Sequence, residues 1–415
     1  MRTQILNIYN KYQEQNPAVR IQYASKHAGV ANGWKKWIGA TEGINNFKGG
    51  EKKQAFEKTF TAWAADKPQY KNLLPDFENN YNQLEKYNIA ATYFSEAGLS
   101  IEVVEFAAGF MGLVNTPADK IESTIETLKK SSKGFFKDYY QPIDEEVAVA
   151  MLTAYRNSQP ADFRPEVLNV IDKKYKGNIE KYVAQLFKKT IFTSPEKVDA
   201  LLDNFTTKDI KKIEKDPAYQ LFTSLYDFYK NSVYPQLSNM TSNNNSLLRK
   251  YMRAQMEMQP NKNFYPDANF TLRVTYGKVG GFEPKDAMVY KHFTTLDGIM
   301  QKENPNIYDY VVEDKLKELY NTNDYGRYAD KDGSMHVAFC AANHTTGGNS
   351  GSPILNADGH LIGLNFDRCW EGTMSDMMYD PNICRNISVD IRYVLFIIDK
   401  YAGASHLINE MTIEQ

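Results

Sequence analysis

The spacing of apolar residues changes near Asn261, and this change divides the chain into a helical part and a part with short strands. Before Asn261, apolar side chains recur at helical spacing. One such face follows Ser194 and Pro195, a pair typical of an N-cap and a first helical position. The polar run 241–246 predicts a turn within this part. The sequence therefore predicts a helical domain over residues 1–260.

Alternating apolar residues and frequent glycines mark the rest of the chain. Residues 270–276 alternate between apolar and polar side chains, which predicts a half-buried strand. Residues 336–340 predict a second strand, and residues 354–366 predict a hairpin around a turn at 356–359. The apolar run 389–398 fits either a strand or a helix. These patterns indicate a β domain that is incomplete.

Composition excludes several classes of protein. The chain has 415 residues, enough for two or three domains, and 42% of them are hydrophobic, enough for a buried core. The formal net charge of −2 argues against a dedicated nucleic-acid binder. The sequence has no run of about 18 apolar residues, so we expect no membrane span. Its opening residues include no apolar stretch of the kind that a signal peptide needs, so we expect no signal peptide in this chain.

Ser350 lies in a glycine-rich run at 346–353, which short apolar segments and a turn follow. A serine hydroxyl attacks a carbonyl efficiently only when a base removes its proton and N–H groups stabilise the oxyanion. The N–H groups of Gly348 and Ser350 have the spacing of the oxyanion donors in chymotrypsin-like peptidases. Gly351 leaves room for a substrate. The alternative is an ordinary glycine-rich turn, which is common in β proteins.

Asp367 and Arg368 end the predicted hairpin. A carboxylate such as Asp367 can bind a substrate ammonium group through a charge-assisted hydrogen bond. Arg368 can bind a carboxylate side chain with two parallel hydrogen bonds. It would also disfavour an apolar side chain, because the guanidinium would lose hydration without gaining a partner. The alternative is that Asp367 and Arg368 form a surface ion pair, which can include Arg385.

The three cysteines, Cys340, Cys369 and Cys384, do not have a metal-ligand spacing. Cys369 and Cys384 flank one loop and are the better pair for a disulfide in an oxidising compartment. The alternative is that all three are ordinary thiols. The sequence contains no phosphate-binding glycine loop, zinc signature or calcium loop. We therefore predict no metal site and no cofactor.

Several long motifs closely resemble those of bacterial serine dipeptidyl peptidases of the dipeptidyl-peptidase 7 and dipeptidyl-peptidase 11 type. They lie at residues 31–39, 264–270, 343–353, 361–368 and 389–396, so the resemblance extends through essentially the whole chain. It implies a chymotrypsin-like double β-barrel with a large helical insertion, which removes dipeptides from the free amino end of peptide substrates. It also implies a homodimer in the periplasm or at the cell surface, with no cofactor.

The resemblance assigns roles to individual residues. Ser350 matches the nucleophile. Asp367 matches an acidic residue that holds the substrate's α-ammonium group, and Asn32 matches an asparagine that helps it. Arg368 matches the specificity position, where arginine implies a preference for Asp or Glu and glycine implies a preference for bulky apolar residues. Cys369 replaces an asparagine that is expected after this arginine.

The catalytic histidine and aspartate of the family precede the helical insertion, whereas this chain starts with a helical pattern. We therefore expect the carboxy-terminal portion of such an enzyme, with little or no hydrolysis by itself. None of the six histidines lies on a matching motif. His344 is interpreted as a structural residue, because it lies very close to Ser350 along the chain.

Together these patterns predict an α+β fold. An all-α helical domain over residues 1–260 precedes the carboxy-terminal part of a chymotrypsin-like double β-barrel over residues 261–415. The predicted function is that of a serine dipeptidyl aminopeptidase, which releases amino-terminal dipeptides with Asp or Glu as the second residue. One alternative is a homologue without catalysis, either a peptide-binding module or a remnant. Another alternative is a dipeptidyl peptidase with an apolar preference.

Overall fold

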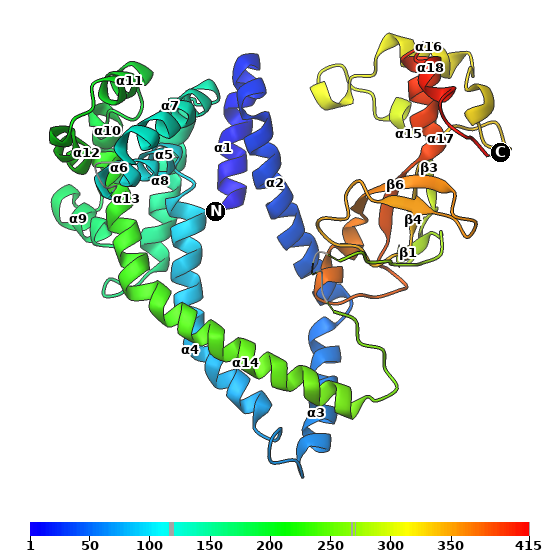
Figure 1. Ribbon diagram of the computed structural model, residues 1–415, viewed down its shortest axis with the longest axis horizontal. Helices are drawn as coiled ribbons and strands as arrows, with labels where there is room; N and C mark the ends of the chain where they lie inside the picture. Colours follow the sequence, from blue (N-terminus) through cyan, green and yellow to red (C-terminus); the bar gives the residue numbers. More distant parts are fainter. Residues whose placement is uncertain (116–119, 267–268, 270, 415) are drawn as a thin grey trace. The chain divides into compact units, whose positions relative to one another are not determined.

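The computed structural model describes the chain except for residues 116–119, 267–268, 270 and 415 (Figure 1). The predicted strand at 270–276 therefore begins outside the described residues, and part of the motif at 264–270 lies outside them too. Helices make up most of the described chain, and small antiparallel sheets make up the rest of its regular structure.

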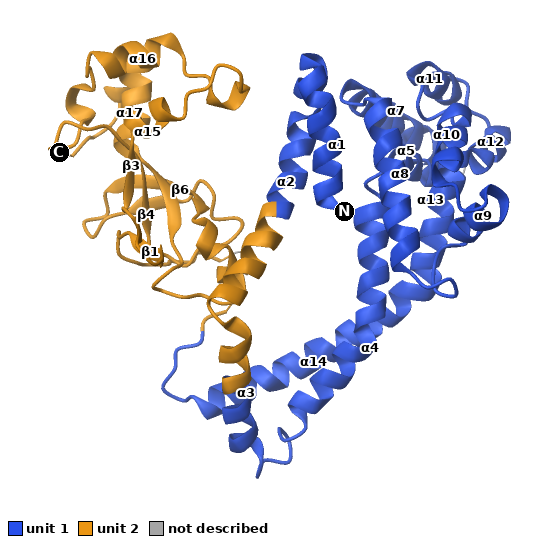
Figure 2. Ribbon diagram, turned by 180° about the vertical axis from the view of Figure 1, so that it is seen from behind, with its two compact units in different colours: residues 1–34, 56–264 blue, residues 35–55, 265–415 orange. Residues whose placement is uncertain are grey.

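The described chain forms two compact units, coloured separately in Figure 2. Unit 1 comprises Met1–Trp34 and Phe56–Phe264, and unit 2 comprises Lys35–Ala55 and Tyr265–Gln415. These units are defined by their internal contacts. The domain boundaries expected from the sequence, 1–260 and 261–415, stay a prediction.

Unit 1 is built from helices, with one large and one smaller cluster of buried apolar side chains. The helices are α1 (Arg2–Gln15), α2 (Pro17–Asn46), α3 (Gly49–Ala64), α4 (Leu73–Tyr93), α5 (Glu102–Gly109), α6 (Met111–Asn115), α7 (Ile121–Lys137), α8 (Gln141–Ser158), α9 (Glu166–Tyr175), α10 (Ile179–Lys189), α11 (Pro195–Asp203), α12 (Ile210–Lys215), α13 (Pro217–Phe228) and α14 (Tyr234–Met258). Helices α2 and α3 contribute residues to both units.

The core of unit 1 explains its stability. The largest cluster of buried apolar side chains includes residues of α1, α5, α8 and α13, and Tyr23, Phe110 and Tyr155 are fully buried in it. Burial of such side chains is the main favourable term in folding. Within the described residues, no single helix is both long and apolar enough to cross a membrane, and only the sharply bent pair Leu73–Gly98 and Glu102–Asn115 meets that test jointly.

Two predictions for unit 1 have opposite outcomes. The Ser194 hydroxyl accepts a hydrogen bond from the Lys197 N–H at 3.3 Å, and Pro195 opens α11, so the predicted cap is confirmed. The predicted turn at 241–246 is wrong, because α14 continues through these residues. Asn244 donates a hydrogen bond to the Tyr81 hydroxyl of α4 at 3.0 Å. Tertiary packing of this kind overrides weak helix propensity.

Unit 2 contains the strands. They are β1 (Phe282–Lys285), β2 (Met288–Tyr290), β3 (Phe293–Thr295), β4 (His336–Ala341), β5 (Pro353–Leu355), β6 (Leu361–Arg368) and β7 (Asn386–Asp390). Its further helices are α15 (Leu296–Gln301), α16 (Asp314–Asn321), α17 (Ile391–Phe396), α18 (Ser405–Ile408) and the 3-10 helix η7 (Trp370–Asp376). A five-stranded antiparallel sheet has the order β3-β4-β7-β6-β5, and β1 pairs with β2 in a separate ribbon.

The hairpin and the strand at 336–340 are confirmed. Strands β5 and β6 pair antiparallel around a turn in which the Asn356 N–H donates to the His360 carbonyl at 3.0 Å. Gly359 supplies the positive φ of 84° that this turn needs. The ambiguous run 389–398 is both strand and helix: β7 ends at Asp390, whose side chain accepts the Arg392 N–H at 2.9 Å and starts α17.

The predicted chymotrypsin-like double β-barrel is wrong. The described strands form an open sheet with edges at β3 and β5, and none of them closes a barrel. Residues 271–276 form no ladder: Leu272 is 96% exposed and Tyr276 is 90% exposed. Alternation gives a strand only where a neighbour can pair with it and one face can be buried. The fold is mostly helical with small antiparallel sheets, and it is not the expected barrel.

Candidate active site

Ser350 lies in the serine loop, which we define as residues 346–352, between β4 and β5. Gly348 and Gly351 have positive φ values of 102° and 83°, which L side chains rarely adopt. The Asn349 side chain accepts a hydrogen bond from the Thr346 N–H at 2.9 Å, and the Asn349 N–H donates to the Thr346 carbonyl at 3.1 Å. These bonds close a tight turn that leaves Ser350 exposed.

The groups around the serine hydroxyl fit oxyanion stabilisation. In the described part of the chain, the N–H groups of Gly348 and Ser350 donate no hydrogen bond to another residue. The Ser350 hydroxyl donates to the Phe366 carbonyl at 3.3 Å. Unpaired N–H groups next to a nucleophile are the arrangement that stabilises a developing oxyanion. The oxyanion role of Gly348 and Ser350 stays a prediction.

Two buried asparagines, which the sequence analysis missed, fix the serine loop to the sheet. The Asn365 carbonyl of β6 accepts the Gly351 N–H at 2.7 Å, and the Asn365 N–H donates to the Ser352 carbonyl at 2.9 Å. The Asn365 side chain donates to the Asn349 carbonyl at 3.3 Å and accepts from the Asn386 side chain at 2.9 Å. Asn365 and Asn386 are 3% and 1% exposed. An asparagine inside an apolar strand was the available signal, because buried amides need partners.

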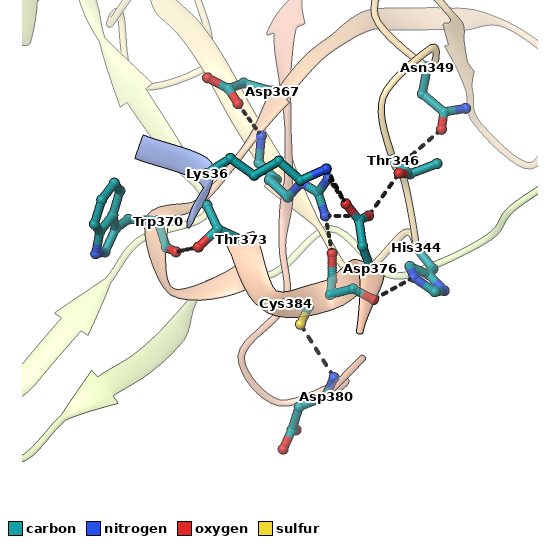
Figure 3. Close-up of polar contacts among 12 residues, drawn as sticks. Lys36, His344, Thr346, Asn349, Asp367, Trp370, Thr373, Asp376, Asp380 and Cys384 are labelled. Carbon is teal, nitrogen blue, oxygen red and sulfur yellow. Dashed lines mark hydrogen bonds and ion pairs between the residues drawn. The ribbon is translucent and has the colours of Figure 1, made fainter. Parts of the chain in front are cut away.

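His344 has partners other than Ser350. Its ring stacks on Tyr379 with 4.5 Å between ring centroids, and its Nε2 lies 3.1 Å from the Ser375 carbonyl oxygen. Figure 3 shows His344 below Thr346 and beside Asp376, the last residue of η7. The geometry agrees with the interpretation of His344 as a structural residue.

Arg368 and Asp376 form the centre of a charged cluster beside the loop (Figure 3). The Arg368 Nη1 and Nη2 atoms donate to the two Asp376 carboxylate oxygens at 2.9 and 3.1 Å, and Nη1 also donates to the Ser375 hydroxyl. The Lys36 ammonium lies 3.0 Å from the Asp376 carboxylate. The Thr346 hydroxyl donates to the same carboxylate at 2.7 Å. Asp376 lies outside every motif from which a site residue was predicted.

The partners of Asp376 decide its charge. Burial by itself would raise the pKa of the carboxyl, but hydrogen bonds from Arg368, Thr346 and Lys36 more than offset burial and hold the pKa well below its usual range. Asp376 is therefore ionised under physiological conditions. The cluster contains two cations and one anion, so it keeps one net positive charge.

Close packing of α2 on η7 brings Lys36 to this cluster. A side-chain carbon on Gly39 would lie 2.4 Å from the Thr373 hydroxyl, and one on Gly43 would lie 2.8 Å from the Met374 sulfur. A larger residue at either position would force the contacted side chains of η7 to move. The glycines of α2 thus set the position of Asp376, at the end of η7, relative to Lys36.

Asp367 and Arg368 do not form the surface ion pair considered as an alternative. Asp367 is exposed and accepts the Arg368 N–H at 2.8 Å, whereas the Arg368 guanidinium pairs with Asp376. The Arg385 side chain donates to backbone carbonyls, including that of Gly280 at 3.1 Å. Asn32 is an exposed residue of α2 in unit 1, and its predicted role stays a prediction.

The cysteines are free thiols among the described residues. The structure brings Cys369 to Cys340, and not to Cys384, which was the better candidate from the sequence. The interaction between the two thiols raises the pKa of Cys369 and lowers that of Cys340. The Cys384 sulfur instead accepts the Asp380 N–H at 3.3 Å.

One group of side chains has the spacing of metal ligands. Atoms of Asp330, Asp332 and His336 lie within 4.8 Å of one another. The Arg392 guanidinium already donates to Asp330 at 2.8 Å and neutralises its charge. This group therefore gives no support for a bound cation.

The chain belongs to the peptidase S46 family, whose sequence profile matches residues 1–413. It is 42% identical over 421 aligned positions to a protein of Flavobacterium psychrophilum named Asp/Glu-specific dipeptidyl-peptidase, covering 100% of this chain and 58% of that protein. It is 39% identical to dipeptidyl-peptidase 7 of Phocaeicola vulgatus, covering 98% of this chain and 57% of that one. The resemblance to this type of peptidase is therefore confirmed.

A crystal structure of Porphyromonas endodontalis DPP11 in complex with the dipeptide Arg-Glu superposes with a TM-score of 0.87 at 35% identity. The match covers 99% of this chain and 59% of that one. The chain thus spans somewhat more than half the length of the relatives that it matches.

Proposed function

We propose that the intact protein is a serine-type dipeptidyl peptidase that releases amino-terminal dipeptides whose second residue is Asp or Glu. The observation that carries this proposal is the path of β6. The Gly351 N–H bonds to the Asn365 carbonyl at 2.7 Å, so the serine loop is fixed to the strand that ends in Asp367 and Arg368. One strand thereby fixes a nucleophile at a defined position relative to an anion-binding group. The names of the relatives support the substrate class.

Ser350 acts as the nucleophile in this proposal. Its hydroxyl attacks the carbonyl carbon of the second residue of the substrate, and a general base takes the hydroxyl proton. The carbonyl oxygen becomes an oxyanion, which the free N–H groups of Gly348 and Ser350 stabilise. Loss of one such donor typically slows a serine peptidase by about 100- to 1000-fold. The oxyanion collapses, the peptide C–N bond breaks, and the rest of the peptide leaves as an amine that takes the proton from the base. Water then attacks the acyl-enzyme ester, breaks its bond to Ser350 and releases the dipeptide.

Asp367 and Arg368 select the substrate. The exposed Asp367 carboxylate binds the α-ammonium group through a charge-assisted hydrogen bond. The Arg368 guanidinium, whose side chain is 16% exposed, binds the acidic side chain of the second residue. A neutral side chain would leave part of this desolvated cation without a partner, which disfavours it.

Dipeptidyl reporters test the proposal. We expect the intact protein to cleave Leu-Asp and Leu-Glu reporters faster than Leu-Leu, and Ser350→Ala to abolish cleavage. Ser352→Ala is the matched control, because Ser352 lies in the same loop and its side chain has no role in the proposed mechanism. Cleavage that survives Ser350→Ala would show that another group is the nucleophile. A preference for Leu-Leu would show that the pocket assignment is wrong.

Peptide binding without chemistry is the second candidate function. The Ser350 hydroxyl donates its proton to a backbone carbonyl, which cannot act as a general base. A fluorophosphonate probe separates the two candidates, because it labels only an activated serine. Labelling of the wild type that is lost in Ser350→Ala supports the peptidase. Peptide binding by calorimetry without labelling supports the binding module.

A further inference from the structure

Asp376 receives donors from three separate segments of unit 2. The Arg368 guanidinium comes from the end of β6, the Thr346 hydroxyl from the serine loop and the Lys36 ammonium from α2. Figure 3 shows Lys36 and Thr346 reaching the same carboxylate from different sides. The Asp376 side chain is 23% exposed, so it is partly shielded from solvent. A residue at such a junction can set the position of the pocket relative to the nucleophile.

The donors of Arg368 are divided between two edges of its guanidinium. A guanidinium has five N–H groups: one on Nε and two on each terminal nitrogen. Asp376 takes one N–H from Nη1 and one from Nη2, and the Ser375 hydroxyl takes the other N–H of Nη1. Among the described residues, Nε donates to none, and neither does the second N–H of Nη2. These two remaining groups point along one edge, which fits a second carboxylate bidentately.

We propose that Asp376 is a positioning residue, which holds the end of the Arg368 guanidinium so that its free Nε–Nη2 edge receives the acidic side chain of the substrate. The hydrogen bond from Thr346 to Asp376 connects this pocket to the serine loop. The acidic side chain of the substrate is therefore held at a fixed position relative to Ser350. This inference rests on the proposed function of Arg368. Asp376 touches neither the substrate nor the reacting atoms, and it acts only through Arg368 and Thr346.

Asp376 has two kinds of contact, with Arg368 and with Thr346, which we call the Arg368 arm and the Thr346 arm. The two arms predict different kinetic effects. The Arg368 arm affects only substrates with an acidic side chain. The Thr346 arm affects the placement of Ser350, so it changes turnover for every substrate. Reporters with Glu or Gln as the second residue separate the arms, because the two side chains have nearly the same shape and differ in charge. Their ratio of kcat/KM measures the first arm, and kcat for the Gln reporter measures the second.

The experiment compares variants of the intact protein with both reporters. We expect Asp376→Asn to lower the Glu-to-Gln ratio by about tenfold, because an amide offers one acceptor where the carboxylate offers two charged ones. Asp376→Glu restores part of the ratio, because it keeps the carboxylate. Asp380→Asn is the matched control: Asp380 lies four residues after Asp376 and pairs with Lys52 of α3 at 3.5 Å. We expect this control to stay within about twofold of the wild type.

Thr346→Val tests the Thr346 arm. It leaves Asp376 in place, so it still gives a result if the Asp376 variants misfold. We expect it to lower kcat for both reporters equally, by about threefold, without a change in the Glu-to-Gln ratio. Ser375→Ala removes the other group that holds Nη1 and should lower the ratio by about threefold.

The outcomes distinguish this inference from the proposed function. If the wild type shows no preference for Glu over Gln, the proposed function itself fails. If the wild type shows the preference but Asp376→Asn keeps or increases it, Asp376 only competes with the substrate for Arg368, and the inference is overturned. An equal loss for both reporters in Asp376→Asn, with a lower melting temperature, would mean a merely structural role and would overturn it too.

Discussion

Two carboxylates, Asp376 in unit 2 and Asp144 in unit 1, show how partners decide the charge of an acid. Asp376 has a guanidinium, an ammonium and a hydroxyl as partners, and its pKa is held far below the usual range. Asp144 lies on α8, is fully buried and accepts the N–H groups of Glu102 and Val103 at 2.6 and 2.9 Å. Burial, together with the nearby Glu102 charge, raises the pKa of Asp144 to about 8.

This difference in partners suits Asp376 to a binding site and Asp144 to a structural role. The Asp376 cluster is partly exposed and keeps one net positive charge, so an anion from solution can reach it. Asp144 instead caps the start of α5 from a neighbouring helix, where its partners are two backbone N–H groups and the Tyr139 hydroxyl at 3.2 Å. A cluster with spare donors can bind a ligand. A saturated buried acceptor can only fix two helices together.

The largest effect is expected when Arg368, one of the two cations of the Asp376 cluster, is replaced. Arg368→Gly should lower kcat/KM for a Glu reporter by about 100- to 1000-fold, since it removes one partner of a charge pair. Arg368→Lys keeps the charge but lacks the planar fork, so it should fall between the wild type and Arg368→Gly. Rates with Leu-Glu and Leu-Leu reporters measure both variants. Survival of the acidic preference in Arg368→Gly would remove Arg368 from the pocket.

The sequence could predict parts of this cluster because their signals are local. The serine loop follows from glycines next to Ser350, and the hairpin that ends in Arg368 follows from its turn residues. Asp376 could not be predicted in the same way. It reaches Arg368 because η7 folds back and α2 packs against it through Gly39, a contact between segments that are far apart in the sequence.

The strand prediction at 270–276 and the turn prediction at 241–246 failed for a related reason. The alternating run at 270–276 and the polar run at 241–246 are local patterns whose outcome depends on neighbours. The first has no pairing strand in its described part, and Leu272 is exposed. The second is held in α14 by contacts with α4, such as that of Asn244 with Tyr81. Local patterns predict an element reliably only where its caps or turns are also local.

Loss of the buried acid should be the next largest effect. Asp144→Ala leaves two N–H groups of α5 without an acceptor and opens a cavity, so unit 1 should lose about 2 kcal/mol of stability. Asp144→Asn keeps one oxygen acceptor and should cost about 1 kcal/mol. Denaturant unfolding measures both, with the exposed Asp162→Ala as a control near zero. Equal costs for the two variants would contradict the capping role.

The two acids should also give stability opposite dependences on pH. The pKa of Asp144 is raised in the folded state, so its contribution is complete below about pH 4, the unfolded value. It is lost as the pH rises through about 8. The pKa of Asp376 is lowered, so its contribution is present above about pH 4 and is lost as the pH falls further.

Unfolding experiments on the variants test these signs. Glu105, whose pKa burial also raises, acts in the same direction as Asp144. We therefore expect Asp144→Asn to reduce, without abolishing, the loss of stability between about pH 5 and about pH 8. Asp376→Asn should leave that window unchanged. A steeper loss in Asp144→Asn would mean that the buried carboxyl is ionised when folded.

The smallest effect concerns a cap at the surface. Ser194 caps α11 with a neutral hydroxyl, which accepts the Lys197 N–H at 3.3 Å and donates to Glu196 at 2.7 Å. Ser194→Ala should cost about 1 kcal/mol, because water can partly replace the hydroxyl, whereas no water reaches the site of Asp144. Ser194→Asp should recover the loss, since a carboxylate also suits the start of a helix. If Ser194→Ala cost as much stability as Asp144→Ala in the same unfolding measurement, solvent access would not explain the expected difference between the two caps.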